Sequence, residues 1–388
     1  FYCLMFFITT NTWASPNPKI QPGAERLSAY LPLLKNKKVA LVINQTSQVG
    51  TTSLLDTLLK EKVAIKKIFV PEHGFRGTAD AGASIKNDID SKTGLPVLSL
   101  YGKNKIPQAS QLQDVDIVLF DLQDVGTRFY TYISTLEYLM DACATYKKHL
   151  IVLDRPNPNG HYIDGPVLES SFKSFVGMQP IPVVYGMTIG EYARMLQGEN
   201  WIKQTSGYTL TVIACSNYSH KMLYQLPIPP SPNLKEMNAV YLYPSLCFFE
   251  GTVISVGRGT DKPFQQWGNP ELKKSYSYSF IPKSVQGAAN PLFEGQACYG
   301  QALSSNLVLL EEAPKDSLCL TYLMAAYQAY PHKEKFFNNF FDKLAGNATL
   351  KAQIIAGTSE AAIRQSWEKE LAAFKIIRKK YLLYQDFE

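Results

Sequence analysis

The chain has 388 residues, of which 46% are apolar and 19% are charged, and its formal net charge is +6. This composition excludes a disordered chain and indicates a folded protein with room for two domains. The densest basic cluster, at 375–380, falls on a helical pattern and predicts a solvated helix face. Nucleic acid is not expected as a partner, because binding to its backbone needs a continuous basic stripe.

Residues 1–18 resemble the remnant of a secretory signal. An apolar stretch, Phe1–Ile8, precedes small and polar residues up to Ser15, and a Pro-Asn-Pro follows. We therefore expect an exported protein, periplasmic or extracellular in a bacterium; the alternative is a short buried segment of the fold. No other apolar run approaches the roughly 20 residues that span a bilayer, so no transmembrane segment is expected in the mature chain.

Apolar strands alternate with helical patterns along the first half of the chain. The strands are expected at 39–43, 63–70, 96–100, 116–120 and 150–153, and the helices at 51–60, 131–147 and 188–198. This alternation predicts an α/β fold with a mostly parallel sheet that is covered on both faces.

Each of the five predicted strands is followed by a polar side chain. These residues are Asn44, Glu72, Tyr101, Asp121 and Asp154. In a parallel sheet all five lie along one edge, where α/β proteins bind their ligands. The sequence lacks glycine-rich nucleotide motifs and metal-binding histidine spacings, so neither a cofactor nor a metal is expected.

Glu72 belongs to the stretch Phe69-Val-Pro-Glu-His-Gly-Phe-Arg-Gly77. A carboxyl group beside His73, with a flexible turn and Arg76 close behind, is typical of an acid/base centre. The equally weighted alternative is a turn in which Glu72 only pairs with Arg76.

The other carboxylates have structural alternatives. Asp121 and Asp124 could share one face of a site or cap the following helix. Asp154 could pair locally with Arg155, and Glu191 fits a capping box better than a catalytic role.

A proline-rich stretch, Leu226–Asn233, predicts a domain boundary near residue 228. Beyond it, Gly257–Asp261 is a loop suited to holding an anion or a hydroxyl-rich ligand through Arg258, although a simple turn is the better prediction for the segment alone. The tail is expected to be helical at 316–330, 333–344, 350–356 and 359–384. A bridge between Cys247 and Cys298 is left open.

Six segments resemble a known family, the exo-β-N-acetylmuramidases called NamZ, which form glycoside hydrolase family 171. They are Pro71–Gly77, Asp121–Tyr132, Leu153–Gly160, Gly165–Glu169, Pro230–Asn233 and the pair Glu250–Thr252 with Gly257–Thr260. The resemblance implies a Rossmann-like catalytic domain at 19–228, a smaller α+β domain at 229–388 and an active cleft between them. It also implies removal of N-acetylmuramic acid from the non-reducing end of peptidoglycan fragments, with Glu72 matching the catalytic glutamate.

The chain departs from the family pattern at three positions. Val253 and Val256 stand where the family has an amide and a carboxylate, and Gln265 stands where it has a glutamate. If these positions contact substrate in relatives, the specificity or the activity of this chain would differ.

Our hypothesis is hydrolysis of a β-glycosidic bond. Glu72 would protonate the leaving oxygen, tuned by His73 or Arg76. A second carboxylate would come from Asp121, Asp124 or Glu169, unless the 2-acetamido group of the substrate takes that role. Three arginines, Arg128, Arg155 and Arg258, are candidates for binding the lactyl carboxylate. The other predicted substrate-binding residues are Asn44, Arg76, Tyr130, Asp154, Asn157 and Glu250.

The expected partners are muropeptides derived from peptidoglycan or MurNAc-GlcNAc saccharides. Aromatic residues near the cleft, Phe129, Tyr130 and Tyr132, would suit the apolar faces of sugar rings, although core packing would explain them equally well. A non-catalytic muropeptide-binding protein is the alternative, and a deacetylase or esterase is a weaker third hypothesis.

Overall fold

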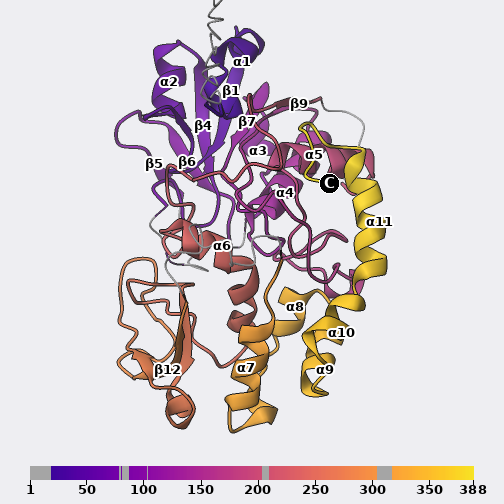
Figure 1. Ribbon diagram of the computed structural model, residues 1–388. Helices are drawn as coiled ribbons and strands as arrows, with labels where there is room; N and C mark the ends of the chain where they lie inside the picture. Colours follow the sequence, from indigo (N-terminus) through magenta and orange to yellow (C-terminus); the bar gives the residue numbers. More distant parts are fainter. Residues whose placement is uncertain (1–18, 78–79, 81–86, 103, 203–208, 304–316) are drawn as a thin grey trace, which may run out of the picture.

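The computed structural model describes residues 19–77, 80, 87–102, 104–202, 209–303 and 317–388. The predicted signal remnant at 1–18 lies outside the described residues. The centre of the first domain is a seven-stranded sheet with the strand order β5-β6-β4-β1-β7-β8-β9 (Figure 1). All neighbours pair in parallel except β5 with β6 at one edge, which confirms the predicted α/β fold with a mostly parallel sheet.

When the six parallel strands are numbered along the chain, their order across the sheet is 3-2-1-4-5-6, as in Rossmann folds. The strands of the sheet are β1 (Lys38–Ile43), β4 (Ala64–Val70), β5 (Asp88–Ile89), β6 (Pro96–Ser99), β7 (Ile117–Asp121), β8 (His149–Leu153) and β9 (Leu210–Ile213). A separate two-stranded ribbon consists of β2 (Gln48–Val49) and β3 (Thr52–Ser53).

Alternate residues of these strands enter two different cores, because successive side chains point to opposite faces of a sheet. In β1, Leu41 packs in one core with α1 (Leu27–Leu34) and α2 (Leu54–Lys60). Val42 packs in the other core, with α4 (Tyr132–Thr145) and α5 (Ile189–Gly198). The central strands therefore have apolar residues on both faces, as a sheet covered on both faces requires.

Short helices complete the first domain. They are η1 (Gly23–Glu25), α3 (Ala109–Leu112) and η2 (Ser170–Phe172). The predicted capping box at Thr188 and Glu191 is confirmed: the Thr188 hydroxyl accepts from the Glu191 amide, and the Glu191 carboxylate accepts from the Thr188 amide.

The smaller second domain begins after the proline-rich linker and combines a three-stranded antiparallel sheet with helices. In Figure 1 its sheet lies at the end of the molecule opposite α1 and α2, and α6 runs between the two parts. Its elements are α6 (Met237–Leu246), η3 (Cys247–Gly251), β10 (Gln266–Asn269), η4 (Pro270–Lys274), β11 (Tyr278–Phe280), β12 (Cys298–Ala302), α7 (Thr321–Ala329), η5 (Lys333–Lys335), α8 (Phe341–Ala345), α9 (Thr349–Ile355), α10 (Glu360–Gln365) and α11 (Glu368–Lys379).

The prediction of one helix at 333–344 is wrong for the residues between η5 and α8. Residues 336–338 instead lie along 251–253, where the Val253 amide donates to the Phe336 carbonyl and the Asn338 amide donates to the Gly251 carbonyl. These tertiary hydrogen bonds replace those of a continuous helix. The helix predicted at 359–384 is likewise divided at Ser366–Trp367 and ends at Lys379.

The last helix returns to the first domain instead of covering the second. In Figure 1, α11 runs upward to the side of α5. The Arg378 guanidinium donates to the Gly186 carbonyl, and the Tyr384 hydroxyl beyond the helix donates to the Asp154 carboxylate. The chain segment 368–388 therefore packs against the domain that was predicted to end at 228.

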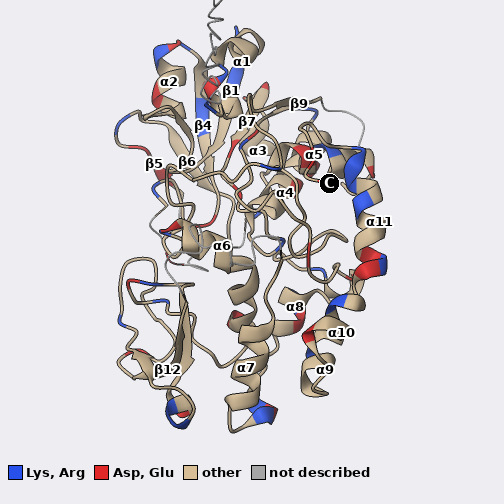
Figure 2. Cartoon of the chain, viewed as in Figure 1, with Lys and Arg blue, Asp and Glu red and all other residues tan. Residues whose placement is uncertain are grey.

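The basic cluster on α11 is paired with acidic residues, and Figure 2 shows both charges on this helix. Arg378 is fully buried and bonds Asp386, which corrects the prediction that the whole cluster is a solvated face. The other three residues are Lys375 and Lys379, which pair with Glu388, and Lys380, which pairs with Glu199.

The five cysteines of the described residues are all free, so Cys247 and Cys298 do not form a bridge. Within the described part of the chain, none of the helices has the length and apolar character that would let it cross a bilayer.

Candidate active site

Strand β4 carries Glu72 to the carboxyl edge of the sheet. The buried end of β4 leads through Pro71 into a turn at 72–77. His73 and Gly74 both have left-handed backbone conformations, with φ of 70° and 74°. Such a conformation costs free energy for a residue with a side chain and is often found at functional sites, so the tight turn after Glu72 is itself a sign of a site.

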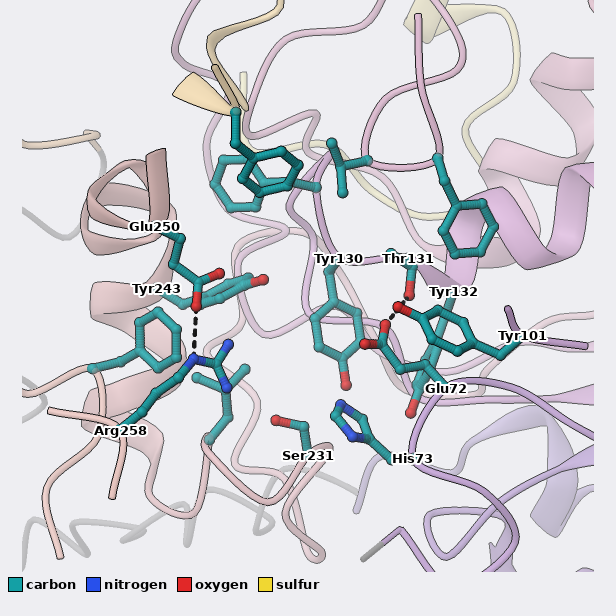
Figure 3. A pocket seen from close by; sticks show the side chains of 16 residues that line it. Glu72, His73, Tyr101, Tyr130, Thr131, Tyr132, Ser231, Tyr243, Glu250 and Arg258 are labelled. Carbon is teal, nitrogen blue, oxygen red and sulfur yellow. Dashed lines mark hydrogen bonds and ion pairs between the residues drawn. The ribbon is translucent and has the colours of Figure 1, made fainter. Parts of the chain in front are cut away.

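Two hydroxyl groups hold the Glu72 carboxylate. Thr131, directly before α4, donates its hydroxyl to Glu72 Oε2 at 2.9 Å (Figure 3). Tyr101, which follows β6, is also hydrogen-bonded to Glu72 through its side chain. Burial, and then the charge and the hydrogen bond of Glu72, raise the pKa of Tyr101 well above its ordinary value. Three segments that are distant in sequence thus fix this carboxylate.

Glu72 faces a cavity of about 440 Å³ that both domains line (Figure 3). The lining is largely aromatic, with Glu72, Tyr101 and Thr131 from the first domain and Glu250 and Arg258 from the second. The other lining residues are His73, Phe129, Tyr130, Tyr132, Phe175, Val176, Ser231, Leu234, Tyr243, Phe264 and Phe340. The predicted cleft between the two domains therefore exists, and its size is that of a small-ligand site.

An ion pair lies across the cavity from Glu72. Arg258 Nε donates to Glu250 Oε1 at 2.6 Å, and the guanidinium lies 5.0 Å from the centroid of the Phe264 ring. Burial is the largest single influence and lowers the pKa of Arg258, but the charge and the hydrogen bond of Glu250, with smaller contributions from Tyr243 and Cys247, together outweigh it and the net shift is upward. The guanidinium thus stays charged beside the cavity.

The interdomain linker, at 229–233, forms part of the cavity lining. Tyr130 donates its hydroxyl to the Pro230 carbonyl at 2.9 Å, and Gln45 donates its side-chain amide to the carbonyls of Pro229 and Pro230. Asn44 donates to the Tyr132 hydroxyl at 2.8 Å. Asn44, predicted to bind substrate, does not line the cavity but supports the tyrosine that does. Tyr130 lines the cavity and anchors the linker.

Asp121 and Arg155 lie outside the cavity lining, contrary to prediction. Arg155 donates to both oxygens of Asp121, at 2.6 and 2.9 Å, and both side chains are buried. The pair occupies the carboxyl edge between β1 and β8, next to the crevice where Rossmann folds bind dinucleotides. Because each group already satisfies the other, neither is available to a substrate.

Asp124, Asp154 and Asn157 are likewise hydrogen-bonded within the protein. The Asp124 carboxylate is buried and accepts from the Tyr185 hydroxyl and the Gly126 amide. The Asp154 carboxylate accepts from several groups, including the Gly190 amide at the start of α5. The Asn157 side chain donates to the Met187 carbonyl and accepts from the Asn159 amide. None of the three lines the cavity.

Three further candidates are also placed away from the cavity. Arg128 is fully buried and donates to four backbone carbonyls, of Pro166, Ile181, Leu344 and Ala345. The side chain of Arg76 is 73% exposed and lies 4.0 Å from Asp90. Glu169 is exposed at the start of η2. Of the predicted arginines, only Arg258 lines this cavity.

The residues that differ from the family pattern face the protein interior. Val256 and Gln265 are 4% and 3% exposed, and Val253 packs against the main core. None of them lines the cavity around Glu72. Within the described residues, no group of His, Cys, Asp and Glu side chains is arranged to hold a metal ion.

Sequence reasoning missed Thr131 and Ser231 as parts of the site and noted Tyr101 only as the residue that follows a strand. Thr131 belongs to the quoted segment Asp121–Tyr132, and Ser231 belongs to Pro230–Asn233. Their membership of family-like segments was the available signal. The sequence of such a segment, however, does not show which carboxylate or cavity a single hydroxyl contacts.

Comparisons with known proteins agree over almost the whole chain. The family described as "Exo-beta-N-acetylmuramidase NamZ, N-terminal" matches residues 39–238, and its C-terminal counterpart matches residues 241–384. The chain is 40% identical to the peptidoglycan β-N-acetylmuramidase NamZ of Bacillus subtilis, over 98% of this chain and 97% of that protein.

Two solved structures from Bacteroides fragilis, both described as DUF1343 family proteins, share the fold. One has 47% sequence identity and a TM-score of 0.88, and the other has 29% identity and a TM-score of 0.79. Each match covers 95% of this chain and all of the other.

Proposed function

The chain belongs to the NamZ family of exo-β-N-acetylmuramidases, and on that premise we propose that it releases N-acetylmuramic acid from the non-reducing end of peptidoglycan fragments. Glu72 serves as the general acid and base of this hydrolysis. The substrates are muropeptides or MurNAc-GlcNAc saccharides, and the reaction takes place outside the cytoplasm, as expected from residues 1–18.

The observation that carries this proposal is the composition of one cavity. A carboxylate held by two hydroxyls, Glu72, faces a guanidinium, Arg258, across a largely aromatic space. Aromatic surfaces cover the apolar faces of a sugar ring, and the guanidinium suits the carboxylate that distinguishes N-acetylmuramic acid from other amino sugars.

In the proposed reaction, protonated Glu72 gives its proton to the glycosidic oxygen as the bond to the anomeric carbon breaks. Glu72 then takes a proton from the water that attacks this carbon. His73 lies beside it in the cavity lining. Thr131 and Tyr101 fix the carboxyl group, so that little further orientational freedom is lost on reaching the transition state.

A second group must stabilise the positive charge that develops on the sugar. The positions of Asp121, Asp124 and Glu169 do not support them in this role. Among the described residues that line the cavity, Glu250 is the other carboxylate, and it forms an ion pair with Arg258. The 2-acetamido group of the substrate itself is the alternative, and it needs no second carboxylate.

Replacement of Glu72 by Gln tests the general acid directly. Glutamine keeps the shape and can still accept the Thr131 hydrogen bond, but it has no proton to give to the leaving oxygen. Turnover of MurNAc-GlcNAc should fall about 100- to 10,000-fold, whereas the affinity for N-acetylmuramic acid, measured by calorimetry, should persist. Glu169→Gln, an exposed glutamate outside the cavity, is the matched control and should retain turnover.

Three results would contradict the proposal. Turnover that survives in Glu72→Gln would remove Glu72 from its role. A wild-type protein that binds the sugar without cleaving it would be a muropeptide-binding protein. Release of acetate or lactate in place of the sugar would indicate a deacetylase or an esterase.

A further inference from the structure

Ser231 is a polar residue of the cavity to which the reaction above gives no role. It lies on the interdomain linker, lines the cavity and is 6% exposed. Its hydroxyl oxygen accepts one long hydrogen bond, 3.4 Å, from the Asn233 amide. Among the described residues, no acceptor takes the proton of this hydroxyl, so a nearly buried donor faces the cavity. Burying such a donor costs free energy unless a partner arrives.

The linker holds Ser231 rigidly. Proline precedes and follows it, and each ring fixes its own backbone φ angle. The preceding residue, Pro230, accepts hydrogen bonds at its carbonyl from Tyr130, Tyr132 and Gln45. On the other side, Asn233 donates its side-chain amide to the Gly287 carbonyl at 2.8 Å. These contacts tie the linker to both domains and leave Ser231 with little freedom to turn away from the cavity.

The position of Ser231 indicates which part of the sugar it meets. In Figure 3 it lies between Glu72 on one side of the cavity and Arg258 on the other. In N-acetylmuramic acid the glycosidic oxygen is on C1, the acetamido group on C2 and the lactyl group on C3. With C1 at Glu72 and the lactyl carboxylate at Arg258, the C2 substituent falls between them, at Ser231.

We propose that the Ser231 hydroxyl donates a hydrogen bond to the carbonyl oxygen of the 2-acetamido group. This inference rests on the proposed function, because it takes the placement of the sugar from Glu72 and Arg258. Ser231 is then a specificity residue: it selects sugars that carry an N-acetyl group over those with a free amine. The amine offers no acceptor and leaves the buried hydroxyl unpaired.

The test compares two substrates in two proteins. MurNAc-GlcNAc and the same disaccharide with the muramyl amine deacetylated are offered to the wild type and to Ser231→Ala. The ratio of their kcat/KM values should fall about three- to tenfold in the variant, the size of one neutral hydrogen bond. Ser231→Thr retains the hydroxyl and should restore at least part of the ratio, and melting temperatures of all three proteins check that they fold.

Calorimetry separates this inference from the proposed function. N-acetylmuramic acid and muramic acid are titrated into the same proteins, and their affinity ratio should fall in Ser231→Ala even if the protein cleaves nothing. An unchanged ratio in both assays would overturn the role of Ser231 while leaving the glycosidase intact. A variant that loses discrimination between muramide and glucosaminide, but not between acetylated and deacetylated sugars, would place Ser231 at the lactyl group and would also overturn it.

Discussion

At the scale of single residues, Arg258 combines a fixed position with unused donors. Its Nε donates to Glu250, and its guanidinium lies over the ring of Phe264. Among the described residues no acceptor bonds its two terminal nitrogens. A guanidinium held in this way can bind a carboxylate with two parallel hydrogen bonds without losing side-chain entropy.

We expect Arg258→Gln to abolish most of the preference for muramides. Glutamine lacks the positive charge and the paired N–H donors of the guanidinium, so the lactyl carboxylate loses its partner. A glucosaminide has no lactyl group and therefore loses no such interaction. The ratio of kcat/KM for the β-N-acetylmuramide over the β-N-acetylglucosaminide of one chromophore should fall about 10- to 100-fold. Lys262→Met, an exposed basic residue of the same loop, is the control. An equal loss on both substrates would indicate that Arg258 only supports Glu250.

The sequence could not show which of the predicted site residues line the cavity. The sequence singled out Glu72, which lies in the cavity lining, although on its own segment a simple turn that pairs with Arg76 had equal weight. It overestimated Arg128 and Arg155, which stand in equally distinctive segments. Both are buried and bonded to the protein itself, Arg128 to carbonyls and Arg155 to Asp121. Nothing in a local pattern tells whether the partner of an arginine is a ligand or a distant part of the same chain.

At the scale of elements, α11 is fixed to the first domain by a buried arginine. Arg378 is fully buried, donates to the Gly186 carbonyl and forms two hydrogen bonds to Asp386. The same guanidinium lies 4.8 Å from the centroid of the Phe387 ring. It therefore joins the helix, its C-terminal extension and the loop before α5.

Arg378→Met should destabilise the protein by about 3 kcal/mol. The substitution leaves Asp386 without its partner in a poorly hydrated position, which is the costly way to break such a pair. Lys379→Ala is the neighbouring control, because its exposed pair with Glu388 contributes under about 1 kcal/mol. Urea unfolding followed by circular dichroism gives both values. Similar small losses in the two variants would show that α11 is held by its apolar contacts instead.

Elements were predictable where the sequence pattern and the local structure agree. The strands β1, β7 and β8 are mostly continuous apolar runs and β4 ends in one, as a sheet covered on both faces favours. The prediction of a helix at 333–344 was wrong because Asn338 donates to the backbone of Gly251 and Glu250. These bonds hold residues 336–338 beside the loop that carries Glu250. Helical propensity is weak, and a tertiary partner of this kind overrides it.

At the scale of the whole molecule, the two domains share the site and the chain crosses between them twice. The linker at 229–233 carries the chain to the second domain, and α11 returns it to the first. The sequence predicted the first crossing from its prolines. It did not predict the second, because an amphipathic helix shows which of its faces is buried but not which surface covers that face.

The first domain also holds a set of buried acids that serve the fold. Burial raises the pKa of Asp124 and of Asp154 to about 6 and that of Glu137, on α4, to about 7. All three pKa values exceed those of an unfolded chain, so the folded state holds these protons to higher pH than the unfolded state does. Their contribution to stability is complete below the unfolded values and is lost as the pH rises through the folded ones.

Asp124→Asn isolates one of these contributions. Its pKa of about 6 lies roughly two units above the ordinary 3.8, so between pH 4 and 7 the wild type should lose about 3 kcal/mol of unfolding free energy through this group alone. Asparagine does not titrate and can still accept from Tyr185 and Gly126, so the stability of the variant should fall less steeply over the same range. Urea unfolding at several pH values measures the difference, with the exposed Asp88→Asn as control. Parallel curves for Asp124→Asn and the wild type would mean that the Tyr185 and Gly126 hydrogen bonds stabilise the charged carboxylate as much as burial opposes it.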